Sequence, residues 1–356
     1  MSTANLDAAD LAAALAAPGL IREDVMDTVY NLDEGIPTPL TDMARSDSFS
    51  NVYSEWTEDD LTAVDITNAV VDGADASGND TKVGLRVGNR AQLSDKVVRI
   101  SHTSESIDTI GRIGTMAYQT AKRLMDLRRD LEAIACGRQA SVADDGSTVA
   151  GKTAGLGAWI ATNTDYGANG GAAGGFDSST KLVDAPVAGD GRALTWEGVR
   201  TQIEAIYNAG GFPSTLMSVP GVIKRINNFL FSTAGAPYRA APTANVQGSS
   251  PATQTAQGYI SVVLSDFGIS LTLVDNRLQQ VYDSGDGTAV DVADVFILDP
   301  AYIGMSYLFG YRNDEIAKTG HADNRLLSTQ WMTKVYREDA HANIADIIPT
   351  SAVTAS

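Results

Sequence analysis

The sequence predicts an α+β protein, and two neighbouring segments carry most of that prediction. Between Lys82 and Arg99, apolar and polar residues alternate with the period of two that an extended strand with one polar face shows. Between residues 107 and 137, apolar residues recur at steps of three and four, which is typical of an amphipathic helix. A strand of that length would reach about 50 Å at roughly 3.3 Å per residue. Because one domain of this size cannot easily cover it, we expect the strand to contact a neighbouring molecule.

The composition is that of a folded chain without the excess of positive charge that nucleic-acid binding needs. With 356 residues the chain can form two domains, and 44% hydrophobic residues suffice for their cores. The formal net charge of -18 argues against phosphate binding as the main task, since that task needs Lys and Arg. Cys136 is the only cysteine, which excludes an intrachain disulfide. We find neither a signal peptide nor an apolar run of membrane-spanning length, and expect a soluble cytosolic chain.

The first 51 residues are predicted to form an arm. Residues 1 to 17 are rich in alanine and indicate a short helix that Pro18 and Gly19 stop. A second small helix is expected from Arg22 to Leu32, after which Pro37 and Pro39 favour an extended path.

Residues 52 to 101 are predicted to form a long hairpin with oppositely charged arms. The first arm, Tyr53 to Val71, is acidic, and a polar tip returns the chain into the basic strand. Because a strand this long must project beyond its own core, its charged face has only neighbouring molecules or the acidic arm to meet. We therefore take six charged residues as candidates for contacts between subunits: Lys82, Arg86 and Arg90 on the basic strand, and Glu58, Asp59 and Asp60 on the acidic arm.

The predicted helix at 107–137 would span about 45 Å at roughly 1.5 Å per residue. Ser104 or Ser106 can cap its start, and Gly137 can end it. Its polar face holds opposite charges at helical spacing, which favours an exposed face. The expected pairs are Asp108 with Arg112, Lys122 with Asp126, and Arg128 with Glu132.

The rest of the chain alternates between loops, helices and strands. Arg138 to Gly175 is rich in loops, and residues 233 to 258 are predicted to form a surface loop. The expected helices are Trp196–Ala209 and Val222–Phe231, and the expected strands are Thr215–Val219, Tyr259–Leu264, Ile269–Val274, Val292–Leu298, Gly304–Leu308 and Leu326–Tyr336. We expect the last strands to return to the long helix.

One segment matches a nucleotide-binding motif. Gly146 to Thr153 fits the P-loop pattern GxxxxGK[ST], and the apolar run Val295 to Asp299 resembles the strand that ends in a magnesium-binding Asp. The context argues against a P-loop NTPase, because the segment follows no buried strand and opens no clear helix. Asp144 and Asp145 would also repel phosphates. A surface loop is the favoured interpretation, and the NTPase is kept as an alternative.

The sequence contains only weak signals for other catalytic or metal-binding motifs. His102, His321 and His341 have no second histidine at ligand spacing. Asp283, Asp286 and Asp291 lack the order of an EF-hand loop, and no GxSxG motif occurs. We therefore predict no catalytic residue, no cofactor and no metal site.

Many short stretches, in a specific order over nearly the whole chain, resemble a family of tailed-phage major capsid proteins. They are Gly19 to Asp24 through Asn31, Pro37 to Pro39, Trp56, Asn89, Gln92, Ser101, Thr103, Gly111 and Arg112, Ala117 to Gln119, Leu127 to Glu132, Gly155 to Ile160, Gly210 to Pro213, Asp266 to Gly268, and Asn276 with Arg277.

The resemblance implies the Hong Kong 97-like capsid fold. Its expected parts are an N-terminal arm at 1–51, an extended hairpin called the E-loop at 52–101, a P-domain beginning at 102–189 with the spine helix at 107–137, an A-domain at 190–273, and a second part of the P-domain with the C-terminal strands at 274–356.

The function implied is that of a major capsid protein. Copies would assemble as hexamers and pentamers into an icosahedral or elongated head that encloses double-stranded DNA without sequence-specific binding. A portal protein is an implied partner, and separate scaffold and decoration proteins are left open; neither a membrane nor covalent cross-links are expected. The implied location is the virion capsid, assembled in the host cytoplasm. Besides the NTPase, a phage surface or tail adhesin that binds ligands through its loops is an alternative.

Overall fold

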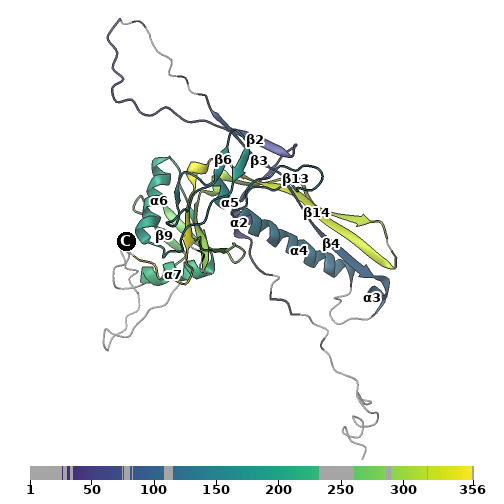
Figure 1. The fold of residues 1–356 in the computed structure, drawn as a ribbon. Helices are drawn as coiled ribbons and strands as arrows, with labels where there is room; N and C mark the ends of the chain where they lie inside the picture. Colours follow the sequence, from purple (N-terminus) through teal and green to yellow (C-terminus); the bar gives the residue numbers. More distant parts are fainter. Residues whose placement is uncertain are drawn as a thin grey trace, which may run out of the picture.

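The computed structural model describes residues 26, 30–32, 35–73, 75, 81, 83–107, 115–231, 260–285, 287, 290–318 and 320–354. The predicted arm helices at 1–17 and Arg22–Leu32 and the predicted loop at 233–258 lie wholly or mostly outside these residues, and so does Lys82. Within them, two larger sheets share one body, and a hairpin projects from it (Figure 1).

The first sheet has four strands and carries the long helix on one face. Its strands, in spatial order, are β1 (Arg45–Ser48), β13 (Ile303–Ile316), β14 (Ala322–Val335) and β4 (Gln92–Ser101). Helix α4 (Met116–Ala135) lies along β4 and β14 (Figure 1). Lys96 of β4 reaches Asp130 of the helix at 2.5 Å. The prediction that the last strands return to the long helix is confirmed.

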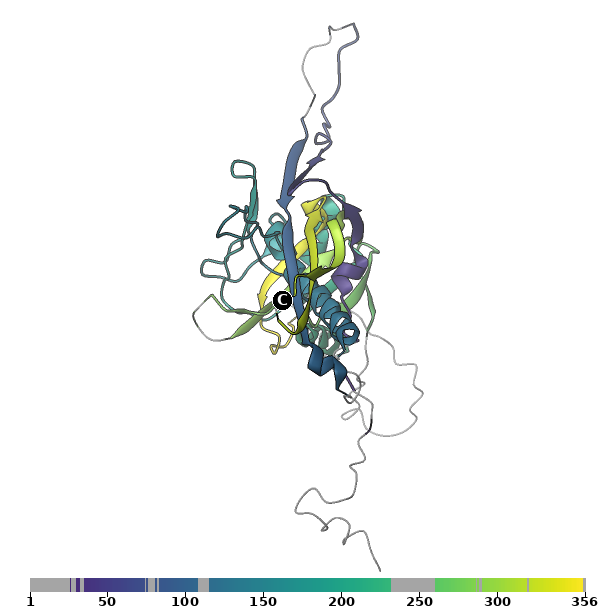
Figure 2. The ribbon, with the colours of Figure 1, turned by 90° about the vertical axis from the view of Figure 1, so that its right-hand side faces the viewer.

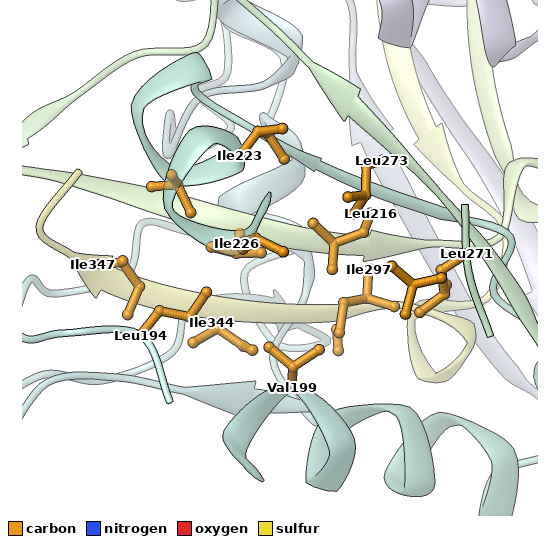
Figure 3. Close-up of a cluster of buried hydrophobic side chains, with 14 of the residues drawn as sticks. Leu194, Val199, Leu216, Ile223, Ile226, Leu271, Leu273, Ile297, Ile344 and Ile347 are labelled. Carbon is orange, nitrogen blue, oxygen red and sulfur yellow. The ribbon is translucent and has the colours of Figure 1, made fainter. Parts of the chain in front are cut away.

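The second sheet has seven strands and is covered by helices on one face. Its strands, in spatial order, are β5 (Thr164–Asp165), β15 (Ala342–Ile347), β12 (Asp291–Leu298), β8 (Thr215–Ser218), β10 (Ser270–Asp275) and β9 (Val262–Leu264), with β11 (Tyr282–Asp283) paired to β12. Helices α6 (Trp196–Asn208) and α7 (Pro220–Phe231) pack their apolar sides on it. Figure 3 shows Val199 and Ile226 of these helices in one cluster with Leu216, Ile297 and Ile344 of the strands.

Strand β12 joins the two cores of the molecule, because both of its faces are buried. Val295 and Ile297 belong to the core under α6 and α7. Phe296 points into a second core, where it joins Leu131 of α4 and Trp331 of β14. A strand buried on both sides reads as a continuous apolar run, as VFIL does here. The boundary predicted at 273/274 falls inside β10, in the sheet that β8, β12 and β15 share, and the division into domains stays a prediction.

Local signals set the ends of α6 as the sequence suggests. The Thr195 hydroxyl accepts a hydrogen bond from the Gly198 amide at 3.2 Å, which caps the first turn. Gly210 follows the helix at a φ of 92°, a conformation that glycine adopts without strain. The predicted helices and strands between residues 196 and 298 are confirmed to within a few residues.

The remaining elements are short. They are α2 (Pro39–Met43), α3 (His102–Ser106), α5 (Leu156–Trp159), β2 (Tyr53–Glu58), β3 (Leu85–Arg90), β6 (Gly175–Asp177), β7 (Leu182–Asp184), and the 3-10 helices η2 (Pro300–Tyr302) and η3 (Glu338–Ala340).

The long helix is shorter than the predicted span of 107–137. Ile107 has an extended backbone, and α4 begins at Met116, so the helix spans about 30 Å at roughly 1.5 Å per residue. Ser101, which precedes the predicted caps, caps the separate helix α3 through its hydroxyl. Of the predicted charge pairs, Asp108 with Arg112 lies outside the described residues.

Two further charge pairs are wrong because the partners are used elsewhere. Arg123, not Lys122, donates to Asp126 at 2.8 Å. Arg128 reaches Asp42 of α2. Glu132 is fully buried and faces away from solvent, so it cannot be part of an exposed stripe.

The predicted single strand from Lys82 to Arg99 is two strands in different sheets. Strand β3 pairs with β2, β4 pairs with β14, and only Ala91 separates them. Figure 2 shows the pair as a nearly continuous blue line from the projecting hairpin down along the body. The alternation of the sequence is real, but the change of sheet at Ala91 places its two halves in different surroundings.

Candidate assembly interface

The projecting hairpin extends away from the rest of the described chain. Strands β2 and β3 pair from Tyr53 opposite Arg90 to Glu58 opposite Leu85. Beyond Glu58, residues 59–73 continue without a strand partner among the described residues. Figures 1 and 2 show this segment standing away from the body in both views.

Apolar side chains gather on this projection although solvent surrounds them. Leu61, Val64 and Ile66 are 96%, 91% and 93% exposed. Val70, Val71 and Val83 are also exposed. A run of exposed large apolar side chains on an extended segment marks a surface that another molecule covers.

The predicted basic residues of β3 have partners in their own chain. Arg86 donates to Glu55 of β2, and most of the Arg86 side chain is exposed. The Arg90 guanidinium lies over the Tyr53 ring, 4.6 Å from its centroid. Lys181 adds a second cation 3.8 Å from Glu55. These contacts stiffen the base of the hairpin, and they leave open whether Arg86 and Arg90 also meet a neighbour.

The predicted acidic residues gather around one guanidinium that the sequence did not single out. Arg337, just after β14, donates to the Asp60 carboxylate and to the Asp59 carbonyl oxygen, the latter at 3.3 Å. The same guanidinium donates to Asp339 at 3.0 Å. Burial, with the neighbouring Asp339 and Glu338, raises the pKa of Glu58 to about 7. We call Glu58, Asp59, Asp60, Arg337 and Asp339 the hairpin clasp.

A second exposed apolar surface lies on the face of the first sheet that points away from α4. Leu93 and Val97 of β4 are 61% and 57% exposed, while the next residue, Val98, is buried. On β13 the Arg312 guanidinium lies 4.2 Å from the centroid of the Phe309 ring. Leu93 and Val97 lie on the apolar parity of the predicted strand, and the long helix packs on the other parity, where Lys96 reaches Asp130.

The P-loop-like segment lacks the geometry that phosphate binding needs. The Gly146 amide donates to Asp144, and the amides of Ser147, Thr148 and Val149 all donate to Asp145 at 2.8 Å. The donors that would cradle a phosphate are thus taken by a carboxylate of the chain itself. These hydrogen bonds hold the pKa of Asp145 well below its usual range.

The residues around this segment also argue against nucleotide binding. Thr153, where a P-loop would place its magnesium-binding hydroxyl, is fully buried and bonds to Asn89 and Thr333. Asp299, the residue matched to the second motif, caps η2 by accepting from the Ala301 amide at 3.0 Å. The NTPase alternative is therefore rejected for this segment.

Of the three histidines, His341 is structural. Its Nδ1 accepts from the Asp299 amide at 3.2 Å, and burial lowers its pKa to about 4. No helix in the described part of the chain is long and apolar enough to cross a membrane.

A helix laid on one sheet, a second sheet with helices on one face and a projecting hairpin are the arrangement of the Hong Kong 97-like fold, which this chain shares with several solved structures. The capsid of the native GTA particle matches with a TM-score of 0.56 at 13% identity, over 94% of this chain and 98% of that one. The SrpI encapsulin of Synechococcus elongatus PCC 7942 gives 0.54 at 11% identity, over 93% and 94%. A Mycobacterium phage Bobi chain gives 0.54 at 12%, over 96% and 98%.

Sequence comparison narrows the class to a family. The chain belongs to the SU10 major capsid protein family, whose model matches residues 3–347. It is also 34% identical over 103 residues to the major capsid protein of Escherichia phage Phieco32, a match that spans 29% of either chain. The predicted fold and the predicted capsid family are both confirmed.

Proposed function

We propose that this chain is the repeating subunit of a tailed-phage head, built as hexamers and pentamers into an icosahedral or elongated shell around double-stranded DNA. The observation that carries the proposal is the projecting segment at 59–73, whose large apolar side chains are mostly exposed among the described residues. Family membership supports the same role. A symmetric shell gives every copy of such a segment a neighbour to cover it.

The contact we propose is between the projecting segment of one copy and the outer face of the first sheet of the next. Residues 59–73 carry acidic charges only, with Asp59, Asp60 and Asp65 among them. The facing sheet offers exposed apolar side chains and Arg312. Apolar area with opposite charge on its rim is the usual composition of a specific interface.

We propose that Arg86 and Arg90 lie at the rim of this interface, where they contact the neighbouring copy. The Arg86 side chain is largely exposed even while it contacts Glu55, so a neighbour's carboxylate can share it. A portal protein, a separate scaffold and decoration proteins remain part of the proposal, as do assembly in the host cytoplasm and the absence of a membrane partner. The net charge of -18 suits a container from which DNA must leave again.

The experiment places one charge at each of two exposed apolar positions, as Leu61→Asp with Ile66→Asp. Both side chains are free in the monomer, so melting followed by circular dichroism should be unchanged, while sedimentation velocity should show loss of shells and large assemblies. Val187→Asp, an exposed valine of the body, is the matched control and should assemble normally. Normal assembly of the double variant would refute the proposed contact.

A further inference from the structure

A group of possible metal ligands lies at the end of the first sheet, where β4 ends and β14 begins. His102, Glu105 and Asp323 each offer one ligand atom, and these three atoms all lie within 4.8 Å of one another. No local sequence pattern reveals this group, because Asp323 lies on a strand that is far from His102 and Glu105 in the sequence. None of these residues belongs to the hairpin clasp or to the proposed interface.

The backbone that carries the three side chains is fixed by its own hydrogen bonds. His102 and Glu105 are three residues apart on α3 and therefore share one side of that helical turn. The His102 amide donates to the His321 carbonyl oxygen at 3.2 Å, next to the ladder pair of Ser101 with Ala322. The chain thus holds the group together without help from the side chains themselves.

The separation of the first two ligand atoms fits a shared ion. His102 Nδ1 lies 3.7 Å from Asp323 Oδ2, which is too far for a hydrogen bond. Two ligands on one tetrahedral zinc ion, each about 2.0 to 2.2 Å from it, lie about 3.3 to 3.6 Å apart. The Glu105 side chain is exposed and can rotate to close the remaining distance.

A second partner holds the Asp323 carboxylate in the orientation that a metal ligand needs. Its other oxygen, Oδ1, lies 2.6 Å from the Lys318 ammonium, which leaves Oδ2 facing His102. Carboxylates that bind metals are commonly held by such a second partner. The two carboxylates and the one lysine leave a net negative charge for a cation to neutralise.

We propose that His102, Glu105 and Asp323 form a binding site for a divalent transition-metal ion of the zinc type, with Lys318 orienting Asp323. An imidazole nitrogen beside two carboxylates favours this class over Ca²⁺ and Mg²⁺, which prefer oxygen ligands alone. A bound ion would tie α3 to the β13–β14 hairpin.

The test uses the full chain, stripped of metal with a chelator and titrated with Zn²⁺ in a calorimeter, with thermal melting in parallel. We expect saturable binding and a rise in melting temperature. His102→Ala and Glu105→Gln should each weaken Zn²⁺ binding at least tenfold and remove that rise. His321→Ala, beside the group but not in it, should retain both.

Three outcomes would overturn the proposal. The first is wild-type protein that shows no saturable Zn²⁺ binding up to millimolar concentration. The second is unchanged affinity in both His102→Ala and Glu105→Gln; His102 is half-buried and Glu105 is exposed, so that a failure of one variant to fold leaves the other. The third is a melting rise with Ca²⁺ that equals that with Zn²⁺ and survives His102→Ala, which would indicate a carboxylate site instead.

Discussion

Arg337 and Asp60 join the end of strand β14 to the root of the projecting segment, across 277 residues of sequence. The same guanidinium holds the Asp59 carbonyl oxygen and the Asp339 carboxylate. One cation therefore sets the direction in which residues 59–73 leave the body. Because Glu58 belongs to the hairpin clasp, the charge of the clasp depends on pH near neutrality.

Glu58 should make the stability of the chain fall as pH rises. Burial raises its pKa to about 7 from an ordinary 4.5, so the folded chain binds more protons than the unfolded one between these values. The stabilisation is fully present below pH 4.5 and is lost as pH rises through 7. After allowance for solvent screening we expect a loss of about 1 kcal/mol.

Glu58→Gln should flatten that part of the pH profile and raise the melting temperature at pH 8. Melting of wild type and variant, followed by circular dichroism from pH 4 to 8, measures this. Asp95→Asn removes an exposed carboxylate of β4 and controls for the change in net charge. Parallel profiles for wild type and Glu58→Gln would show that Glu58 does not titrate in this range.

Reversing two charges on β3 should prevent assembly and spare the fold. Arg86→Glu with Arg90→Glu opposes like charges across every copy of the proposed contact, while exposed charge pairs contribute only about 0 to 1 kcal/mol each to folding. Particle yield by sedimentation and melting by circular dichroism measure the two effects separately. Arg86→Lys with Arg90→Lys keeps the charge and should assemble. Normal shells from the reversed variant, or a chain that no longer folds, would each argue against an intersubunit role.

Lys152→Ala should change nothing measurable. The amides of Ser147, Thr148 and Val149 in its P-loop-like segment already donate to Asp145, and exposed substitutions usually stay within about 0.5 kcal/mol. Melting temperature and particle yield should match wild type. ATP hydrolysis by the wild type that Lys152→Ala abolishes would restore the NTPase interpretation.

Glu132→Ala should be among the most destabilising single changes in α4. The buried carboxylate accepts from the Leu40 amide, the Thr41 amide and the Asn276 side-chain amide, each at 2.8 Å. Its removal leaves these donors unpaired, at a cost of about 3 to 5 kcal/mol. Denaturant unfolding measures this cost, with Asp130→Ala, which removes a half-exposed partner of Lys96, expected to cost no more than about 1 kcal/mol. Equal costs for both variants would contradict the assigned role of Glu132.

The sequence predicted elements well where apolar period and caps agree, as in α6 with Thr195 and Gly210. It failed where tertiary contacts decide. The alternation from Lys82 to Arg99 contains no signal that the chain changes sheet at Ala91. Strand β15 went unpredicted because its buried residues include Asn343 and Asp346, which break the apolar pattern.

The sequence predicted only those residues of the candidate interface that lie close together along the chain. Charge and length singled out Glu58, Asp59 and Asp60, but Arg337 reaches them from the far end of the sequence. Asp323 approaches His102 in the same way. Contacts over such separations depend on the register of β4 against β14, which no local pattern specifies.

An electron micrograph of the purified chain, alone and co-expressed with proteins of its phage, tests the central claim most directly. The account predicts closed shells of uniform size in which the projecting segment of each copy lies on its neighbour. A chain that remains a monomer or a small oligomer at every salt concentration, with phage partners present, would contradict it.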